Sequence, residues 1–274
     1  MLGGGLEPGT LTVVHGTTGV GKTQLGLSFL NAGLQAEEQR GVLVDLTTRG
    51  DSQQHAEYAR RLFGWEVVDG SIPKQSVFTP PEPMPNRFTG LDYQGKPVTR
   101  ANLTDEEWRI WSQQLAIKME EVTAFMYAHF ARGTRRVMID GIEPSKRAED
   151  SVQLRLIEYI YQQILRTDSD WVARSLFRGE WQRVKDAVER CAYNKDDVCT
   201  LVLQTSNEIM LTELMSREIV EGDLGTNATT ILLLGRWPEG AHLGRAAFVL
   251  KNRGKRASED VVPFTITEEG LTPL

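Results

Sequence analysis

The sequence has few cysteines, no cationic leader and no long hydrophobic run, and each absence excludes a class of protein. Its two cysteines, Cys191 and Cys199, have no second Cys or His pair nearby, so they match neither a zinc-binding spacing nor a disulfide framework. The first residues, MLGGGLEPGT, lack the charged and apolar parts of a signal peptide, and no stretch approaches the roughly 18 apolar residues of a membrane helix. The net charge of −6 gives no general attraction to nucleic acid or anionic lipid. We therefore expect a cytoplasmic protein with no membrane association and no nucleic-acid partner.

Short apolar runs indicate a sheet. With 274 residues and 40% hydrophobic residues, the chain can form one large core. Helical patterns separate the first four runs, which is typical of a mainly parallel sheet flanked by helices. The last runs are separated only by the turn signal Pro238, Glu239, Gly240, which predicts an antiparallel C-terminal edge. The predicted strands are Leu11 to His15, Val42 to Leu46, Arg136 to Asp140, Leu201 to Gln204, Thr229 to Leu234 and Ala246 to Leu250.

Helices are predicted in the middle of the chain. Thr104 and Glu107 form a capping box for a helix that extends to Arg132, with Trp108 and Trp111 on its apolar face. Further helices are expected from Val152 to Ile164 and from Asp170 to about Arg190. Residues 71–100 hold six prolines, which exclude a helix or a central strand. Such a segment can be a lid, a partner-binding arm or a disordered insertion, and we expect a mobile surface insertion.

A glycine-rich loop carries the strongest functional signal. The motif GTTGVGKT follows the first predicted strand and opens a helix, the context that phosphate binding requires. Its backbone N–H groups and the helix N-terminus would bind the phosphates of ATP, the lysine would contact the β and γ phosphates, and the threonine would bind Mg²⁺. The predicted nucleotide-binding residues are Gly16, Thr17, Thr18, Gly19, Val20, Gly21, Lys22 and Thr23.

A second magnesium ligand is expected at the end of another strand. The apolar run Val137, Met138, Ile139 ends in Asp140, as a Walker B strand does. An aspartate at a strand end is often only a turn former or a helix cap. Because the glycine-rich loop needs a metal partner, we predict that Asp140 acts on Mg²⁺ directly or through water.

These motifs together resemble the KaiC-like branch of the RecA superfamily of P-loop ATPases. The resemblance rests on LGGGLEPGTLTVVHGTTGVGKTQL, on the Asp140 strand and on AAFVLKNRGKRASEDVVPFTITEEGL. It implies one RecA-like domain over residues 1–274, with additions at about 71–100 and 168–197. It also implies a homo-oligomer, commonly a hexamer, in which Lys251 and Arg253 reach the γ phosphate held by a neighbouring subunit. Gln204 falls where such proteins carry a γ-phosphate sensor.

One departure from the family affects the expected activity. In the family, the strand after the first helix ends in glutamate, which activates the attacking water, but here Thr47 and Thr48 stand at those positions. A hydroxyl is a poor general base at neutral pH. Asp45 lies about 7 Å back along the strand, and Asp51 is a looser candidate. ATP binding with slow or degenerate hydrolysis is therefore expected.

The favoured function is an ATPase or ATP-gated oligomeric switch that regulates an unidentified protein partner. The alternative is a DNA-binding recombinase. Recombinases of this superfamily bind DNA through loops corresponding to Ser206 to Asn227, where five acidic residues face Arg217 alone and would repel phosphates. A kinase would need an acceptor site, which the sequence does not identify.

Overall fold

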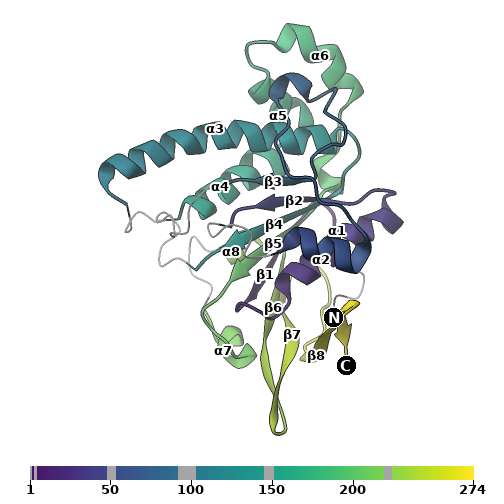
Figure 1. The fold of residues 1–274 in the computed structure, drawn as a ribbon, viewed down its shortest axis with the longest axis vertical. Coiled ribbons are helices and arrows are strands. Elements are labelled where there is room, and N and C mark those ends of the chain that lie inside the picture. The colour runs from purple at the N-terminus through teal and green to yellow at the C-terminus, as the bar shows by residue number, and fades with distance from the viewer. Residues whose placement is uncertain (1, 3–4, 48–53, 92–102, 145–150, 219–223) are drawn as a thin grey trace.

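The computed structural model describes residues 2, 5–47, 54–91, 103–144, 151–218 and 224–274 (Figure 1). Short helical turns also occur at Lys74–Ser76, Tyr161–Leu165 and Lys195–Asp197. The main elements are, in chain order, β1 (Leu11–Gly16), α1 (Lys22–Ala36), β2 (Val42–Asp45), α2 (His55–Phe63), β3 (Arg87–Thr89), α3 (Asp105–Phe130), β4 (Arg136–Ile142), α4 (Val152–Ile160), α5 (Ser169–Leu176), α6 (Trp181–Arg190), β5 (Cys199–Thr205), α7 (Leu211–Met215), α8 (Leu224–Asn227), β6 (Thr230–Glu239), β7 (His242–Asn252), β8 (Val262–Thr267) and β9 (Gly270–Pro273).

The strands of the described chain form one sheet in the order β3-β2-β4-β5-β1-β6-β7-β8-β9. The six strands from β3 to β6 are parallel, and β7, β8 and β9 continue the sheet in antiparallel fashion. The predicted α/β class and antiparallel C-terminal edge are confirmed. The β6–β7 hairpin turns later than predicted, because Pro238 and Glu239 still pair with β7. The carboxyl ends of all the parallel strands therefore lie together along one edge of the sheet, and the loop after β1 lies at this carboxyl-terminal edge.

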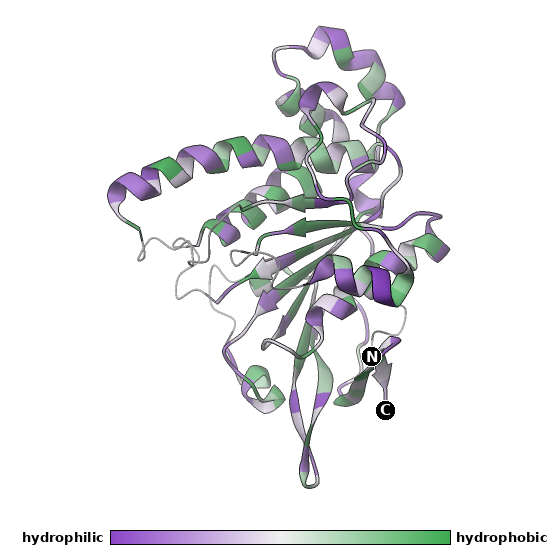
Figure 2. Cartoon of the chain, viewed as in Figure 1, coloured by the Kyte–Doolittle hydropathy of each residue, from purple (hydrophilic) through white to green (hydrophobic). Residues whose placement is uncertain are grey.

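Helices cover both faces of the sheet, and alternate strand residues supply two separate cores. On one face, α1 and α2 pack over Val14, Leu43 and Met138. On the other, α3 and α4 pack over the neighbouring residues Val13, Val44 and Ile139. Figure 2 shows the strands as mainly hydrophobic and the outer sides of the helices as mixed. This burial on both faces explains why the parallel strands are continuous apolar runs.

The helix predictions are mostly confirmed. Thr104 caps α3 in a capping box with Glu107, although Trp108 and Trp111 are only half-buried. The second predicted helix is α4, continued by a π-helical turn to Leu165. The single helix predicted from Asp170 to Arg190 is wrong, because α5 and α6 are separate. None of the described helices combines the length and apolar character that crossing a lipid bilayer requires.

The proline-rich segment is anchored in the core as far as Leu91, so the expectation of a mobile surface insertion is wrong for these residues. Ile72, Val77 and Phe88 are each at most 1% exposed. β3 forms the outer edge of the sheet beside β2, where prolines nearby are tolerated. Residues 92–102, which contain Pro97, lie outside the described part of the chain. The sequence pattern missed this anchoring because isolated apolar residues between prolines have no periodicity.

Replacing Phe88 tests this anchoring. Phe88→Ala should lower the free energy of unfolding by about 3–5 kcal/mol, because its ring is fully buried and packs against the Phe125 ring, with centroids 5.6 Å apart. Denaturant unfolding measures the change. The control is Gln75→Ala, an exposed position in the same segment, which should change stability by less than about 0.5 kcal/mol. Equal small effects in both variants would contradict a segment held in the core.

Candidate functional site

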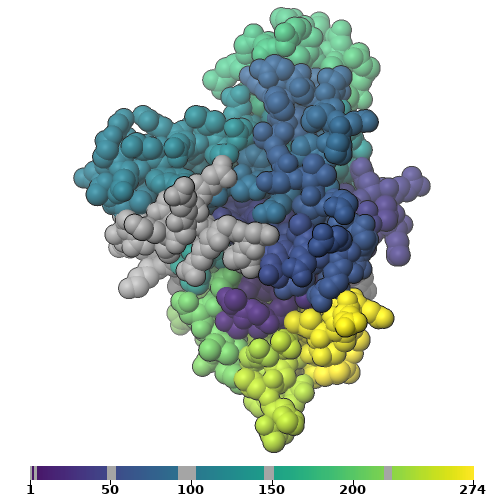
Figure 3. All heavy atoms as spheres, in the orientation of Figure 1, coloured from purple at the N-terminus to yellow at the C-terminus, as the bar shows by residue number. Residues whose placement is uncertain are grey.

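The glycine-rich loop, residues 16–23, joins the central strand β1 to the first helix. Gly19 and Gly21 have φ angles of 79° and 102°, a left-handed conformation that glycine adopts without strain. No described side chain caps the N-terminus of α1, so the helix end presents backbone N–H groups and positive potential at the loop. In Figure 3 the purple N-terminal part of the chain reaches the surface beside the yellow C-terminal strands. The loop is therefore suited to an anion.

Lys22 lies inside this loop. Its Nζ donates hydrogen bonds to the carbonyl oxygens of Gly16 at 2.8 Å and Thr17 at 2.9 Å. Burial lowers the pKa of Lys22 to about 8, although the negative charge of Asp140 acts in the opposite direction. A hydrogen bond from an ammonium group to a charged oxygen is stronger than one to a neutral carbonyl. Lys22 can therefore exchange its backbone partners for a phosphate oxygen.

Thr23 and Asp140, the two predicted magnesium ligands, lie in hydrogen-bonding contact. The Thr23 hydroxyl donates to Asp140 Oδ2 at 3.0 Å, across the intervening strand β5. The backbone N–H of Gly141 donates to the other carboxylate oxygen at 2.7 Å. Hydroxyl and carboxylate oxygens are ligands that Mg²⁺ accepts. The described residues contain no group of three His, Cys, Asp or Glu side chains that could hold a metal alone, so a cation here would need oxygens from phosphate or water.

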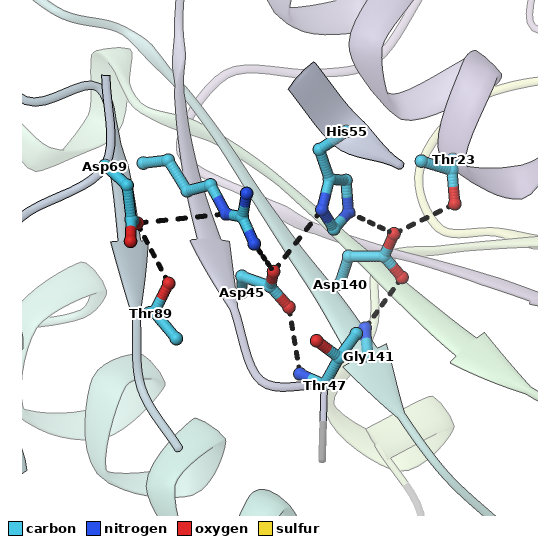
Figure 4. Close-up of polar contacts among 9 residues, drawn as sticks. Thr23, Asp45, Thr47, His55, Asp69, Thr89, Asp140 and Gly141 are labelled. Atoms are coloured by element: carbon cyan, nitrogen blue, oxygen red, sulfur yellow. Dashed lines mark hydrogen bonds and ion pairs between the residues drawn. The ribbon is translucent and has the colours of Figure 1, made fainter. Parts of the chain in front are cut away.

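A buried histidine joins Asp140 to a second carboxylate (Figure 4). Asp45 and Asp140 lie directly opposite one another on the neighbouring strands β2 and β4. His55, the first residue of α2, has its Nε2 2.9 Å from Asp140 Oδ2 and its Nδ1 3.3 Å from Asp45 Oδ2; the second contact is an ion pair that is not well aligned as a hydrogen bond. Burial would lower the pKa of His55, but the interactions with the carboxylates of Asp140 and Asp45 outweigh it and raise the pKa to about 9. His55 is therefore an imidazolium at neutral pH.

Asp45 is fully engaged in structural contacts. Its Oδ2 also meets the Arg87 guanidinium at 2.7 Å, and its Oδ1 accepts the backbone N–H of Thr47 at 2.9 Å. Burial would raise the pKa of Asp45, but the interactions with His55 and Thr47 lower it to about 2. Asp45 is 1% exposed. A carboxylate with this pKa and no access to solvent is a poor base, so the structure argues against Asp45 as a replacement for the missing glutamate.

The other residues singled out from the sequence are Thr47, Thr48 and Asp51, at or near the position of the missing glutamate, and the predicted sensor Gln204. Thr47 follows β2 and is 7% exposed. Thr48 and Asp51 lie outside the described residues. Gln204, at the carboxyl end of β5, lies opposite His15 of β1 and one position before the partner of Gly16. It is 6% exposed, and its Oε1 has no hydrogen-bond partner in the described chain. The sheet register thus places Gln204 beside the residue that precedes the loop.

Lys251 and Arg253 lie at the other end of the parallel strands, where β6 begins. Lys251 pairs with Ile231 at the start of β6, whereas the loop follows Gly16, which pairs with Leu234. The Lys251 ammonium donates to the Gly225 carbonyl at 2.8 Å, and the Arg253 guanidinium donates to the Thr226 carbonyl at 3.3 Å. The structure therefore does not bring these two cations to the loop of their own chain.

Sequence reasoning missed His55 and Arg87. The sequence does indicate that cations are needed, because Asp45 and Asp140 both end apolar runs and two buried carboxylates close together require positive charge. Which cations fill this role depends on how α2 and β3 pack, and local periodicity does not contain that information.

No protein-family model matches this chain, and no curated protein was found to match it.

Asp45→Asn tests the structural role of this carboxylate. The substitution should lower the free energy of unfolding by about 3 kcal/mol, because it leaves the buried His55 cation without one of its two carboxylate partners. Asp69→Asn is the matched control, since Asp69 is 53% exposed and lies 3.8 Å from the same arginine; it should cost less than about 1 kcal/mol. Similar losses in both variants, measured by chemical unfolding, would show that Asp45 is no more important than a surface charge.

Proposed function

We propose that this chain is a RecA-like, KaiC-type nucleotide-binding protein that holds ATP and Mg²⁺ at residues 16–23. The observation that carries the proposal is the meeting of Lys22, Thr23 and Asp140 at one edge of the sheet. Lys22 lies within a glycine-rich loop, and Thr23 is hydrogen-bonded to a carboxylate 117 positions further along the chain. A turn that merely connects β1 to α1 would need neither feature.

The residues present fit a Mg²⁺-bound triphosphate. The loop N–H groups and Lys22 would hold the phosphates, while Thr23 and Asp140 would hold the metal. When bound, such a nucleotide supplies a γ-phosphoryl group that is open to attack by water. The chain's own residues would fix its position and neutralise its charge, and Gln204, opposite His15 in the sheet, would serve as the γ-phosphate sensor. The mainly parallel sheet with an antiparallel C-terminal edge also agrees with the RecA-like resemblance.

Slow turnover is part of the proposal. Thr47 replaces the glutamate of the related family, and Asp45 is held by His55 and Arg87. General bases typically contribute about 10²- to 10⁴-fold to a rate. A protein that binds ATP tightly and lacks this group works as a switch, in which bound ATP favours one state for the lifetime of the complex. We propose that the state so favoured is a homo-oligomer, with six subunits as in related proteins, that regulates a protein partner.

The positions of Lys251 and Arg253 support an interface role. They lie at the end of the parallel strands away from their own loop, and they donate hydrogen bonds to backbone carbonyls. Cations with such partners can turn to a phosphate presented by a second subunit with a gain in charge-assisted hydrogen bonding. ATP would then stabilise the oligomer by mass action.

Lys22→Ala tests the nucleotide site. ATP affinity should fall by about 100-fold or more, because charged hydrogen bonds contribute about 1.5–3 kcal/mol each. Calorimetry measures the affinity, and thermal unfolding checks that the fold is retained. Lys255→Ala is the control, since it removes the same charge from an exposed lysine paired with Glu7 at 3.4 Å. Equal ATP affinity in the Lys22 and Lys255 variants would disprove the assignment of the loop.

Arg253→Ala tests the subunit contact. ATP-dependent assembly, measured as particle mass, should weaken while the ATP affinity of the isolated subunit changes little. A mixture sharpens the test: Lys22→Ala subunits keep the cations and lose ATP, and the Lys251→Ala, Arg253→Ala double variant does the reverse. Partial recovery of assembly in the mixture is expected. No recovery at any ratio would mean that the two residues do not act on a neighbour's nucleotide.

A further inference from the structure

The contact between His55 and Asp140 suggests a role for a residue that the proposed site does not use. Asp45 and Asp140 are opposite residues on adjacent parallel strands, and they are 1% and 3% exposed. Like charges at opposite positions repel, and in a buried setting the repulsion is strong. Without a cation between them, one carboxylate would take up a proton or turn away.

His55 is held in place from several directions. Its side chain is fully buried, and Arg87 contacts Oδ2 of Asp45, the same oxygen that faces the imidazole ring. The residue before it, Gln54, has a φ of 50°, a left-handed conformation that is rare outside glycine. Such a conformation costs on the order of 1 kcal/mol and persists where the surrounding contacts determine it. The start of α2 places His55 between the two carboxylates.

Asp140 Oδ2 receives two donors from different helices. Thr23 Oγ1 approaches from α1 at 3.0 Å, and His55 Nε2 approaches from α2 at 2.9 Å. Gly141 N–H holds the other oxygen, Oδ1, at 2.7 Å. The orientation of the carboxylate group is thereby fixed, and with it the place where Thr23 and Asp140 would share a cation.

We propose that His55 is a positioning residue that holds Asp140 against the Thr23 hydroxyl, so that the metal-dependent part of ATP binding depends on it. This inference rests on the proposed function. Hydrogen-bond partners of metal ligands orient those ligands, and their loss typically weakens metal affinity by about 10- to 100-fold. His55 contacts neither the loop nor Lys22 in any described hydrogen bond or ion pair, so the metal-independent part of ATP binding does not depend on it.

The experiment compares two substitutions that each keep half of the imidazole's donors. His55→Gln retains an N–H group near the position of Nε2, which faces Asp140, while His55→Asn retains one near Nδ1, which faces Asp45. For each protein, ATP affinity is measured by calorimetry with Mg²⁺ and with EDTA, and the ratio gives the metal-dependent gain. We expect His55→Asn to reduce this ratio about 10- to 100-fold and His55→Gln to keep it within about threefold of wild type. Affinity in EDTA should be unchanged in both.

Two further variants control for effects on folding. The double variant Asp45→Asn, His55→Asn removes one carboxylate together with the cation, so it restores the charge balance that His55→Asn alone disturbs; it should show the same lower ratio. His129→Asn replaces another buried histidine, hydrogen-bonded to the Pro85 carbonyl at 2.8 Å and remote from Asp140, and should leave the ratio unchanged.

The outcomes separate this inference from the function on which it rests. If wild-type protein binds no ATP, the proposed function fails, and the inference fails with it. If wild-type protein gains affinity from Mg²⁺ but the Asn and Gln variants keep that gain equally or lose it equally, the inference alone is overturned, because His55 would then be only a counterion for the buried pair.

Discussion

The carboxylate of Asp140 accepts hydrogen bonds from three separate parts of the chain, and the rest of the site depends on this convergence. Thr23 comes from α1, His55 from α2, and the backbone of Gly141 from β4 itself. A buried carboxylate is stable only when its charge is neutralised and its oxygens are hydrogen-bonded. The first two helices are thereby tied to the centre of the sheet at the edge where the glycine-rich loop lies.

The charges at this edge alternate along a line from the loop to the outer strand. Asp140, His55, Asp45 and Arg87 contact one another in this order, and the charge of Asp140 also acts on Lys22. This order keeps two carboxylates ionised in the core and leaves Asp45 unsuited to accept a proton from water. Among the described residues, both buried carboxylates at this edge are held by hydrogen bonds and ion pairs, which agrees with the proposed ATP-dependent switch with slow turnover.

Much of the fold and the centre of the site could be predicted from the sequence, for identifiable reasons. The buried parallel strands are continuous apolar runs, and the strand, glycine loop and helix around Lys22 form a contiguous motif. Asp140 was predicted because a metal site needs a carboxylate at a strand end. By contrast, three features depend on packing between segments far apart in the chain: the anchoring of Phe88, the break between α5 and α6, and the bridge made by His55. Local sequence patterns do not contain this information. The roles of Lys251 and Arg253 come from family resemblance alone, and in the described chain both residues contact backbone carbonyls.

Calorimetric titration of the wild-type protein with ATP, ADP and AMP in the presence of Mg²⁺ tests whether the loop recognises the phosphates of a Mg²⁺-bound nucleotide. We expect ATP and ADP to bind and AMP to bind at least about 100-fold more weakly, because Lys22 and the loop N–H groups act on the phosphates that AMP lacks. Equal affinity for all three nucleotides, or no binding of any, would contradict phosphate recognition by the loop.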